Sequence, residues 1–364
     1  MFGWIWYGLD PKYPIRIFPL LYCRSYYKME QHRKVRKPLK RQRIGTKASS
    51  LWYPLDNPSM ELSLNKTLPS GQSFLWKRYW KEIDNQEYWL GVVDDTIVQL
   101  YQVGTLGPIY FQPVQSLSAT SIEHLKKRLS ELFNLHISYS SLLEEFCKVD
   151  PRFETVIKYT QGARVLSLDP VECLCGYLCS ANNNIQRISK MMQHIAQHGD
   201  YIGQVEQHKF YRFPTLHRLQ QVTEEDWRSH RFGYRAKYLV QCIDRLIQLG
   251  GMEWLLQLKQ LDREQVISQL MQLPGIGHKV ASCIALVSLG KHDEIPVDTH
   301  IWQVVLRSYL PQLQGKTLTE RIHREIGEWF RGKFGAYAGW AHNTLFVGEL
   351  ETSRMGPRNK KEAS

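Results

Sequence analysis

The sequence predicts an α+β fold, in which a small N-terminal antiparallel β-sheet precedes a mostly helical body. Between residues 62 and 113, short aromatic and β-branched runs are separated by turn residues, a pattern typical of strands. From residue 121 onward, apolar residues recur with the 3.6-residue period of helices. The chain has 364 residues, of which 43% are hydrophobic, enough for one large or two moderate domains with a substantial core.

Each expected element has its own signal. The expected strands are "FLWKRYW", "EYWLGVV", "TIVQLYQ" and "PIYFQP", with Asp94 and Asp95 as a hairpin turn between the second and the third. Asp169 followed by Pro170 is typical of a helix start, and glycines at 250, 251 and 290 are typical of helix ends. Helices are expected near residues 121–133, 139–148, 153–160, 169–180, 185–198, 235–249, 263–273, 276–289, 299–310, 318–333 and 337–350.

We expect four segments along the chain: a basic disordered tail over residues 1–50, a sheet domain with flanking helices over 51–150, a helical domain over 151–352 and a basic tail over 353–364. The net charge of +12 lies in these tails. Residues 1–49 hold twelve Lys and Arg against two acidic residues, and residues 354–364 hold four against one. The body between them is close to neutral, so the high net charge does not by itself predict a basic binding face there.

The N-terminal tail carries two signals that suggest different destinations. Residues 1–29 are aromatic, basic and poor in acidic residues, which resembles an organelle-import segment. Residues 32–43, "HRKVRKPLKRQR", are typical of a nuclear-import patch or a DNA-tethering arm. Met29 lies between the two and offers a second start. We expect a nuclear protein with the mitochondrion as a second destination; a basic tail without any address is the alternative. No run of 18 apolar residues exists, so no membrane partner is expected.

Cysteine usage indicates a reducing compartment. The seven cysteines are odd in number and scattered, unlike a disulfide framework. Cys173, Cys175 and Cys179 in "CLCGYLC" invite a metal interpretation, but no fourth ligand of matching spacing follows. We therefore expect these three side chains in the core of a buried helix.

A glycine turn between two helical patterns is the first functional signal. In "LPGIG" (residues 273–277), Pro274 ends one helix, while Gly275 and Gly277 permit a tight turn with exposed backbone N–H groups. Such a turn before a helix start binds anions, and a phosphodiester is the obvious anion. The pattern is typical of a helix-hairpin-helix, which holds the DNA backbone without reading its sequence.

Lys279 stands in the first turn of the second helix, in an otherwise apolar run. The helix dipole and the apolar neighbours are both expected to lower its pKa, and a neutral amine is a nucleophile. Cys283 lies one turn on, on the same face. The alternative is a surface lysine whose stem lies along apolar neighbours.

Asp298 follows nineteen residues later in "PVDTH", at an expected helix N-cap. If its carboxylate reaches the same site as Lys279, it can accept the lysine's proton or stabilise positive charge on a sugar carbon. Capping alone is the alternative, and one residue can do both.

Six ordered blocks carry a resemblance to a known family. These are "LPSGQSFLW", "DPVECLCGYLCSANNNIQRI", "FGYRAKY", "LPGIGHKVASC", "PVDTH" and "YAGWAHNTLF". Over residues 62–350 the chain resembles the eukaryotic 8-oxoguanine DNA glycosylase/AP lyases of the helix-hairpin-helix (HhH-GPD) superfamily. The resemblance implies base excision repair, with residues 151–352 as the catalytic domain. The cysteine cluster that holds iron and sulfur in some relatives is missing, and no cofactor is expected.

The resemblance implies roles for the catalytic and base-recognition residues. Lys279 attacks the anomeric carbon, expels the base and forms a Schiff base, after which elimination nicks the strand 3′ to the lesion; Asp298 stabilises the charged intermediate. The backbone carbonyl of Gly71 accepts the N7–H that 8-oxoguanine has and guanine lacks. Phe346 and Cys283 cover the two faces of the flipped base. Each of these residues could equally serve packing or a turn.

Other positions match DNA-contacting residues of the family. Asn182, Arg187 and Arg235 fill the gap and read the orphaned cytosine, Tyr234 is a wedge, and His300 contacts a phosphate. Gly275 and Gly277 belong to the hairpin that binds the backbone. The carbonyls of Met271, Leu273 and Ile276 could hold a structural cation, and no catalytic metal is expected. The implied partner is double-stranded DNA with oxidised guanine opposite cytosine, bound by a monomer.

Two positions depart from the family. His342 stands where the family carries glutamine, and Ala181 replaces a serine. A neutral imidazole offers one donor and one acceptor on opposite sides, so a two-point contact with the base becomes one. Three interpretations therefore stay open: excision of 8-oxoguanine and of ring-opened formamidopyrimidine-guanine, excision of a different oxidised purine, or lesion binding without catalysis. The last is disfavoured because binding needs neither Lys279 nor Asp298.

Overall fold

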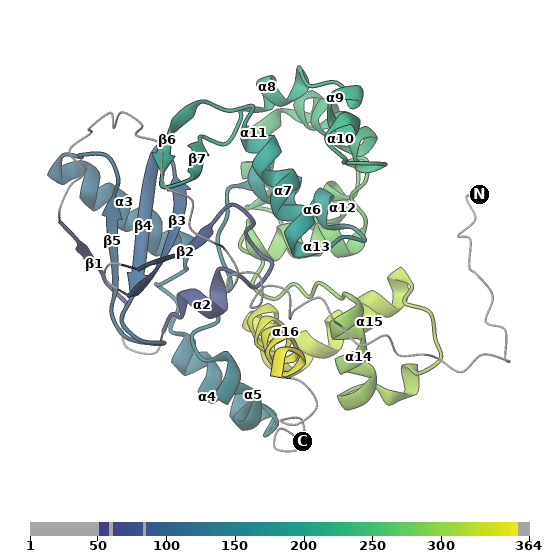
Figure 1. The fold of residues 1–364 in the computed structure, drawn as a ribbon. Coiled ribbons are helices and arrows are strands. Elements are labelled where there is room, and N and C mark those ends of the chain that lie inside the picture. Colours follow the sequence, from purple (N-terminus) through teal and green to yellow (C-terminus); the bar gives the residue numbers. More distant parts are fainter. Residues whose placement is uncertain (1–50, 58–60, 83–84, 356–364) are drawn as a thin grey trace, which may run out of the picture. The chain divides into compact units, whose positions relative to one another are not determined.

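The computed structural model describes residues 51–57, 61–82 and 85–355. The chain divides into two compact units at Gly45, and every described residue belongs to the second unit, Thr46–Ser364. The predicted N-terminal tail and residues 356–364 of the predicted C-terminal tail lie outside the described residues. Everything below concerns the second unit, whose elements are labelled in Figure 1.

The predicted antiparallel sheet is present. Its strand order is β1-β5-β4-β3-β2, and every pairing is antiparallel. Val93 pairs with Thr96, and Asp94 has φ +51°, so the two-aspartate hairpin turn is confirmed. The first strand, β1, was not predicted, and β2 begins three residues later than expected. The strands are β1 (Tyr53–Leu55), β2 (Lys77–Lys81), β3 (Gln86–Val93), β4 (Thr96–Gln102) and β5 (Ile109–Pro113).

Both faces of the sheet are covered. One face contributes Trp89, Leu100 and Phe111 to the main core, in which α3 (Ala119–Leu132) also takes part. The other face contributes Leu90 and Ile97 to a small second core. Phe210 closes that core from an unpredicted hairpin, β6 (Tyr201–Val205) and β7 (His208–Tyr211). The turn of this hairpin, with Glu206 at φ +50°, contains none of the residue types that usually favour turns, so the hairpin was not predicted.

The helical body follows the predicted ranges to within a few residues. The short helices α2 (Leu64–Thr67), α8 (Leu216–Gln220), α9 (Glu224–Ser229) and α11 (Gly251–Leu258) were not predicted. The remaining helices are α4 (Tyr139–Val149), α5 (Phe153–Thr160), α6 (Pro170–Ser180), α7 (Ile185–Ala196), α10 (Arg235–Leu249), α12 (Arg263–Leu270), α13 (His278–Val287), α14 (Thr299–Ser308), α15 (Glu320–Phe334) and α16 (Ala338–Met355). None of the helices in the described ranges combines the length and the apolar content that crossing a bilayer requires.

Helix α6 is buried almost all round and packs against α7, α10 and α13. Its three cysteines lie in the core, as predicted. Helix α16 packs against α5, α14 and α15 (Figure 1). The site described below therefore draws on α6 and α13 from one group of helices and on α14 and α16 from the other.

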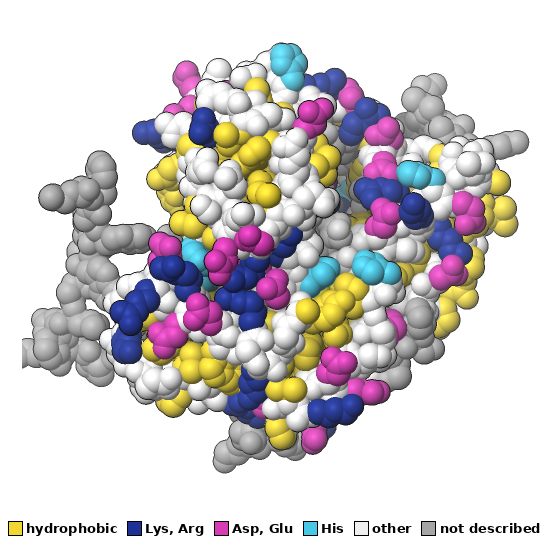
Figure 2. Space-filling view, turned by 180° about the vertical axis from the view of Figure 1, so that it is seen from behind, with side chains coloured by type: hydrophobic (Ala, Val, Ile, Leu, Met, Phe, Trp, Pro, Cys, Tyr) yellow, Lys and Arg dark blue, Asp and Glu magenta, His cyan; other side chains and the backbone are white. Residues whose placement is uncertain are grey.

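A buried ion pair links distant segments of this unit. Arg164 is fully buried and donates to the carboxylate of Glu61 at 2.8 Å and to the carbonyl of Phe133 at 2.7 Å. Glu61 also accepts from the backbone N–H of Tyr139 at 2.6 Å. Because each charge is fully hydrogen-bonded, the pair can stay ionised away from water. On the face seen in Figure 2, basic and acidic side chains are interspersed, in keeping with a nearly neutral body.

Candidate active site and nucleic-acid interface

The predicted helix-hairpin-helix is formed by α12 and α13. Gly275 has φ +83°, and a Cβ atom there would lie 2.9 Å from the side chain of Tyr238, so this position requires glycine. Gly277 is the N-cap of α13, and no side chain caps that helix start. The first N–H groups of α13 are therefore available to an anion, which fits the predicted contact with a phosphate.

Lys279 lies in the first turn of α13, with its stem partly buried. Its Nζ is 5.5 Å from the ring centroid of Tyr177, which comes from α6. Cys283 and Asp298 both act electrostatically on the Lys279 ammonium. The structure thus brings together the lysine and the aspartate, nineteen residues apart, at one site.

The predicted lowering of the lysine pKa is wrong. Burial does disfavour the charge on Lys279, but Cys283 and Asp298 outweigh it, so the pKa of Lys279 lies above its ordinary value. The prediction of the lysine pKa counted the helix dipole and the apolar neighbours, but it did not count the charge of Asp298, which the fold brings to bear on Lys279. In the resting protein Lys279 is therefore an ammonium, and a proton must leave before it can attack.

Asp298 caps α14, as predicted. Its Oδ1 accepts from the backbone N–H of Ile301 at 2.9 Å. This bond orients one oxygen along the helix, while the negative charge acts on Lys279. Capping and a catalytic role are therefore compatible in this geometry.

His342 on α16 is buried, with 6% of its surface exposed. Within the described structure, neither ring nitrogen has a hydrogen-bond partner of normal geometry. Burial lowers its pKa to about 4, although Asp298 and the nearby Pro296 carbonyl oppose that lowering. The ring is therefore neutral at physiological pH. This buried imidazole lies beside the lysine and the aspartate, and a bound ligand can supply the hydrogen bond that it lacks.

Phe346 and His300 lie next to each other, with ring centroids 6.2 Å apart. Phe346 is partly exposed and His300 is exposed. Cys283 is buried, and burial raises the pKa of its thiol. Gly71 has φ +85°, which favours glycine in a turn, and lies near the side chain of Ile185 at the start of α7.

The structure also gathers the residues predicted to contact the opposite strand. Asn182 is exposed with φ +48°, and its carbonyl accepts from Arg235 at 2.9 Å. Arg235 donates to the Ala181 carbonyl as well, and the Tyr234 hydroxyl joins the same carbonyl at 3.0 Å. Arg187 donates to the carbonyl of Arg231, in the loop that also holds Tyr234, at 2.9 Å. Two loops far apart in sequence thus form one surface.

Arg235 differs from the expectation in its surroundings. Its side chain is only 3% exposed and its Nε has no partner within the described structure. In this state it supports the loop of Ala181 and Asn182 and leaves little of itself for contact with a base. To contact the orphaned cytosine, Arg235 would have to break one of these hydrogen bonds and form a new one with the base.

The predicted cation position lies in the hairpin turn. The Leu273 carbonyl accepts from the Ile276 N–H at 3.1 Å, and Met271 caps the end of α12. Across the residues that the structure describes, no three His, Cys, Asp or Glu side chains group as a metal site would require.

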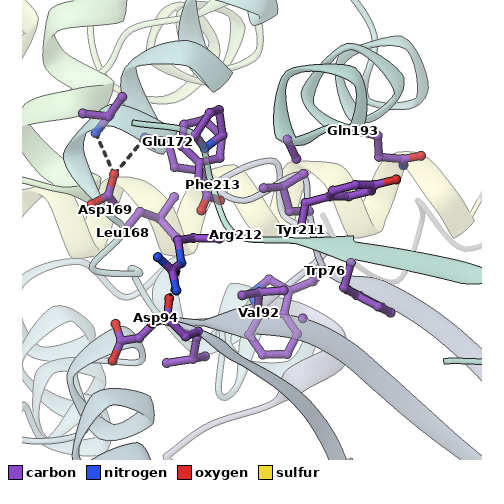
Figure 3. A pocket seen from close by; sticks show the side chains of 18 of the residues that line it. Trp76, Val92, Asp94, Leu168, Asp169, Glu172, Gln193, Tyr211, Arg212 and Phe213 are labelled. Carbon is purple, nitrogen blue, oxygen red and sulfur yellow. Dashed lines mark hydrogen bonds and ion pairs between the residues drawn. The ribbon is translucent and has the colours of Figure 1, made fainter. Parts of the chain in front are cut away.

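A cavity of about 870 Å³ lies elsewhere, between the sheet, β7 and the start of α6 (Figure 3). Burial and Asp169 raise the pKa of Glu172 in its wall to about 7, and Arg212 there pairs with Asp95 at 2.5 Å. None of the predicted site residues lines it. The candidate active site is instead the one at Lys279, because an amine and the carboxylate of Asp298 influence each other there.

Comparison with known proteins identifies the family. The family model "8-oxoguanine DNA glycosylase, N-terminal domain" matches residues 54–174, and "HhH-GPD superfamily base excision DNA repair protein" matches residues 175–331. N-glycosylase/DNA lyase OGG1 of Arabidopsis thaliana is 39% identical over 319 residues, 87% of this chain and 85% of that protein. The chain belongs to the 8-oxoguanine DNA glycosylase family. The predicted class of enzyme and its place in base excision repair are thereby confirmed.

Further relatives of the 8-oxoguanine DNA glycosylase family agree with this. An N-glycosylase/DNA lyase of Saccharomyces cerevisiae is 29% identical over 80% of this chain and 84% of that protein. The Clostridium acetobutylicum 8-oxoguanine glycosylase/lyase, solved with DNA that has cytosine opposite 8-oxoguanine, has a TM-score of 0.69 and 25% identity over 83% of this chain and 98% of that chain. The predicted α+β fold is confirmed. His342 and Phe346 lie beyond the segment that the second family model matches.

Sequence reasoning missed Tyr177 as a member of the site. Its ring is 5% exposed and lies below the Lys279 nitrogen. It stands inside the block that also holds the cysteines, and its helical spacing looks like core.

Proposed function

We propose that the protein is a bifunctional DNA glycosylase/AP lyase that excises 8-oxoguanine and formamidopyrimidine-guanine opposite cytosine. One observation carries the proposal: Asp298 acts on Lys279 at the start of a helix that follows a glycine hairpin. Binding to DNA requires the hairpin alone, whereas an amine and a carboxylate at one site are chemistry for a sugar carbon.

The reaction follows from these two groups. The Lys279 nitrogen, after losing a proton, forms a bond to C1′ as the bond from C1′ to the base breaks, and the base leaves with that electron pair. Asp298 stabilises the positive charge that develops on the sugar. Ring opening then gives a Schiff base between Lys279 and C1′. Loss of a C2′ proton breaks the bond from C3′ to its oxygen, which nicks the strand 3′ to the site.

The lesion is recognised after it leaves the duplex. Phe346 stacks on the flipped base and Cys283 covers its other side. The Gly71 carbonyl accepts the N7–H of the oxidised base, and His342 contacts its pairing edge. The described positions support this, since Phe346 is accessible and His342 has unpaired nitrogens.

The gap left in the duplex is filled by the two joined loops. Asn182, Arg187 and Arg235 face the orphaned cytosine, and Tyr234, which is 49% exposed, enters beside it. Gly275, Gly277 and His300 hold the phosphates of the damaged strand. The protein acts as a monomer on DNA, without a membrane partner.

Reductive trapping with borohydride tests this proposal. Wild type and Lys279→Gln are incubated with duplexes that carry 8-oxoguanine opposite cytosine, 8-oxoguanine opposite adenine, or formamidopyrimidine-guanine. We expect a covalent complex with wild type only, strongest opposite cytosine. Lys279→Gln should still bind the duplex in a gel-shift assay. Binding by wild type without trapping on any duplex would contradict the lyase assignment.

His342 supports a second candidate, a glycosylase for a different oxidised purine. A single imidazole contact reads the pairing edge less completely than two contacts would. Trapping of the formamidopyrimidine duplex alone would favour this candidate and leave the chemistry at Lys279 unchanged.

We also propose a nuclear location, with the mitochondrion as a second destination. Support comes from the basic segment at residues 32–43 and the acid-poor residues 1–29. Fluorescent fusions that start at Met1 and at Met29 test it. Loss of the mitochondrial signal from the shorter fusion is expected, and an unchanged distribution would contradict the import segment.

A further inference from the structure

Tyr177 offers an aromatic face to the nucleophile. The Lys279 Nζ lies over this ring, 5.5 Å from its centroid, within the roughly 6 Å over which a cation and a π system attract. The ring is held by the buried helix α6, and Phe74 meets its edge with a centroid distance of 6.4 Å. The position of the ring is therefore set before DNA binds.

Few charges face Lys279 near neutral pH. Burial raises the pKa of the Cys283 thiol and lowers the pKa of His342 to about 4 and of His323 to about 3, which leaves these groups uncharged. Near neutral pH, Asp298 is then the charged group that compensates the ammonium, while the neutral Cys283 thiol contributes through its hydrogen bond with Lys279. The titratable groups of the described structure that interact with Lys279 are Tyr177 on α6, Cys283 on α13, Asp298 at the start of α14, His323 on α15 and His342 on α16.

We propose that Tyr177 is a positioning residue. Its ring holds the Lys279 nitrogen in two cationic forms, the resting ammonium and the iminium of the Schiff base. The inference rests on the proposed function. Between these forms the nitrogen is a neutral amine, for which a π face has little attraction. The ring therefore raises the pH at which the amine becomes free and favours the covalent intermediate that follows.

The hydroxyl of Tyr177 does not supply this attraction. Burial raises the pKa of this phenol well above its ordinary value, so it stays protonated. The ring, rather than a phenolate, then supplies the attraction. Tyr177→Phe keeps the ring and removes only the hydroxyl, so it is the starting point of the test.

A graded series of fluorinated phenylalanines at position 177 isolates the ring. Each fluorine weakens the negative potential of the π face and barely alters the shape of the side chain. Trapping is measured against pH on a duplex with an abasic site, which bypasses base recognition by His342. From Phe to trifluoro-Phe we expect the midpoint of the pH profile to fall by roughly 0.5 to 1 unit, and the trapped fraction by about two- to fivefold.

The same analogues at Phe74 are the matched control, because this ring packs against Tyr177 and has no cation–π contact with Lys279 within the described structure. They should leave the profile unchanged. A flat profile across the series at position 177, or a large loss in Tyr177→Phe with no further change, would overturn the role of the ring. If wild type is not trapped on the abasic duplex, the proposed function fails instead.

Discussion

His342 lies buried beside Asp298, and within the described structure its two ring nitrogens have no hydrogen-bond partner of normal geometry. Burying a polar group without a partner costs on the order of 1–3 kcal/mol, so the free protein carries a cost that a bound base can relieve. His342→Gln replaces opposed donor and acceptor sites with an amide that offers both on one side. We expect this variant to excise 8-oxoguanine about tenfold faster, relative to formamidopyrimidine-guanine, in single-turnover assays. An unchanged ratio would show that the side chain does not face the base.

We also expect His342 to make the free energy of unfolding depend on pH. The folded pKa of about 4 lies below the ordinary value of 6.5. The unfolded chain therefore takes up a proton first as the pH falls, and stability that is complete above pH 6.5 is lost between pH 6.5 and 4. Relative to His342→Gln, wild type should lose up to roughly 3 kcal/mol over this range. Urea denaturation at pH 7, 5.5 and 4 measures this, and parallel curves for the two proteins would count against the neutral buried ring.

At α14, one aspartate combines a cap with a charge, and substitution separates them. Asp298→Asn keeps an oxygen that accepts from Ile301, so we expect the free energy of unfolding to change by less than about 0.5 kcal/mol while trapping falls at least tenfold. Asp298→Ala should lose trapping and about 1 kcal/mol of stability as well. Full trapping by Asp298→Asn would mean that capping is the residue's whole contribution.

Local signals account for most of the helices and strands. Asp169 and Asp298 cap their helices as predicted, and Asn184 caps α7, because a cap depends on a side chain and the next three backbone N–H groups. The hairpin of β6 and β7 escaped prediction, because Phe210 holds it to a sheet that is distant in sequence. Its turn residues alone would not select a hairpin.

Within this unit, we expect the Arg164–Glu61 pair to affect the free energy of unfolding more than any surface ion pair does. Removing one partner leaves the other charge buried and unpaired, so Arg164→Met is expected to cost about 3–5 kcal/mol. The control, Arg228→Met, breaks an exposed pair with Glu224 and should cost about 0.5 kcal/mol or less. Urea denaturation at pH 7 compares the two variants. A similar small cost for both would show that water reaches the Arg164 site.

The assembly of the site from separate elements could not be predicted from the residues alone. Lys279, Asp298 and His342 belong to three helices, and only the packing of α13, α14 and α16 places them together. The resemblance assigned these residues to one site, and in the structure they influence one another electrostatically, but the resemblance carried no information about their protonation. Nor did it predict that Arg235 would be buried against the Ala181 carbonyl.

Residue types and their local order were sufficient for the glycine hairpin, the caps and the candidate nucleophile, since each depends on neighbours within one or two turns. The protonation of Lys279, the isolation of His342 and the ring of Tyr177 beneath the lysine needed the folded structure. The physical reason is that a pKa sums burial and charge over every segment packed around a group, and the groups around Lys279 include Tyr177 from α6 and Asp298 from the start of α14. Folding raised a pKa that the apolar sequence around Lys279 alone would have lowered.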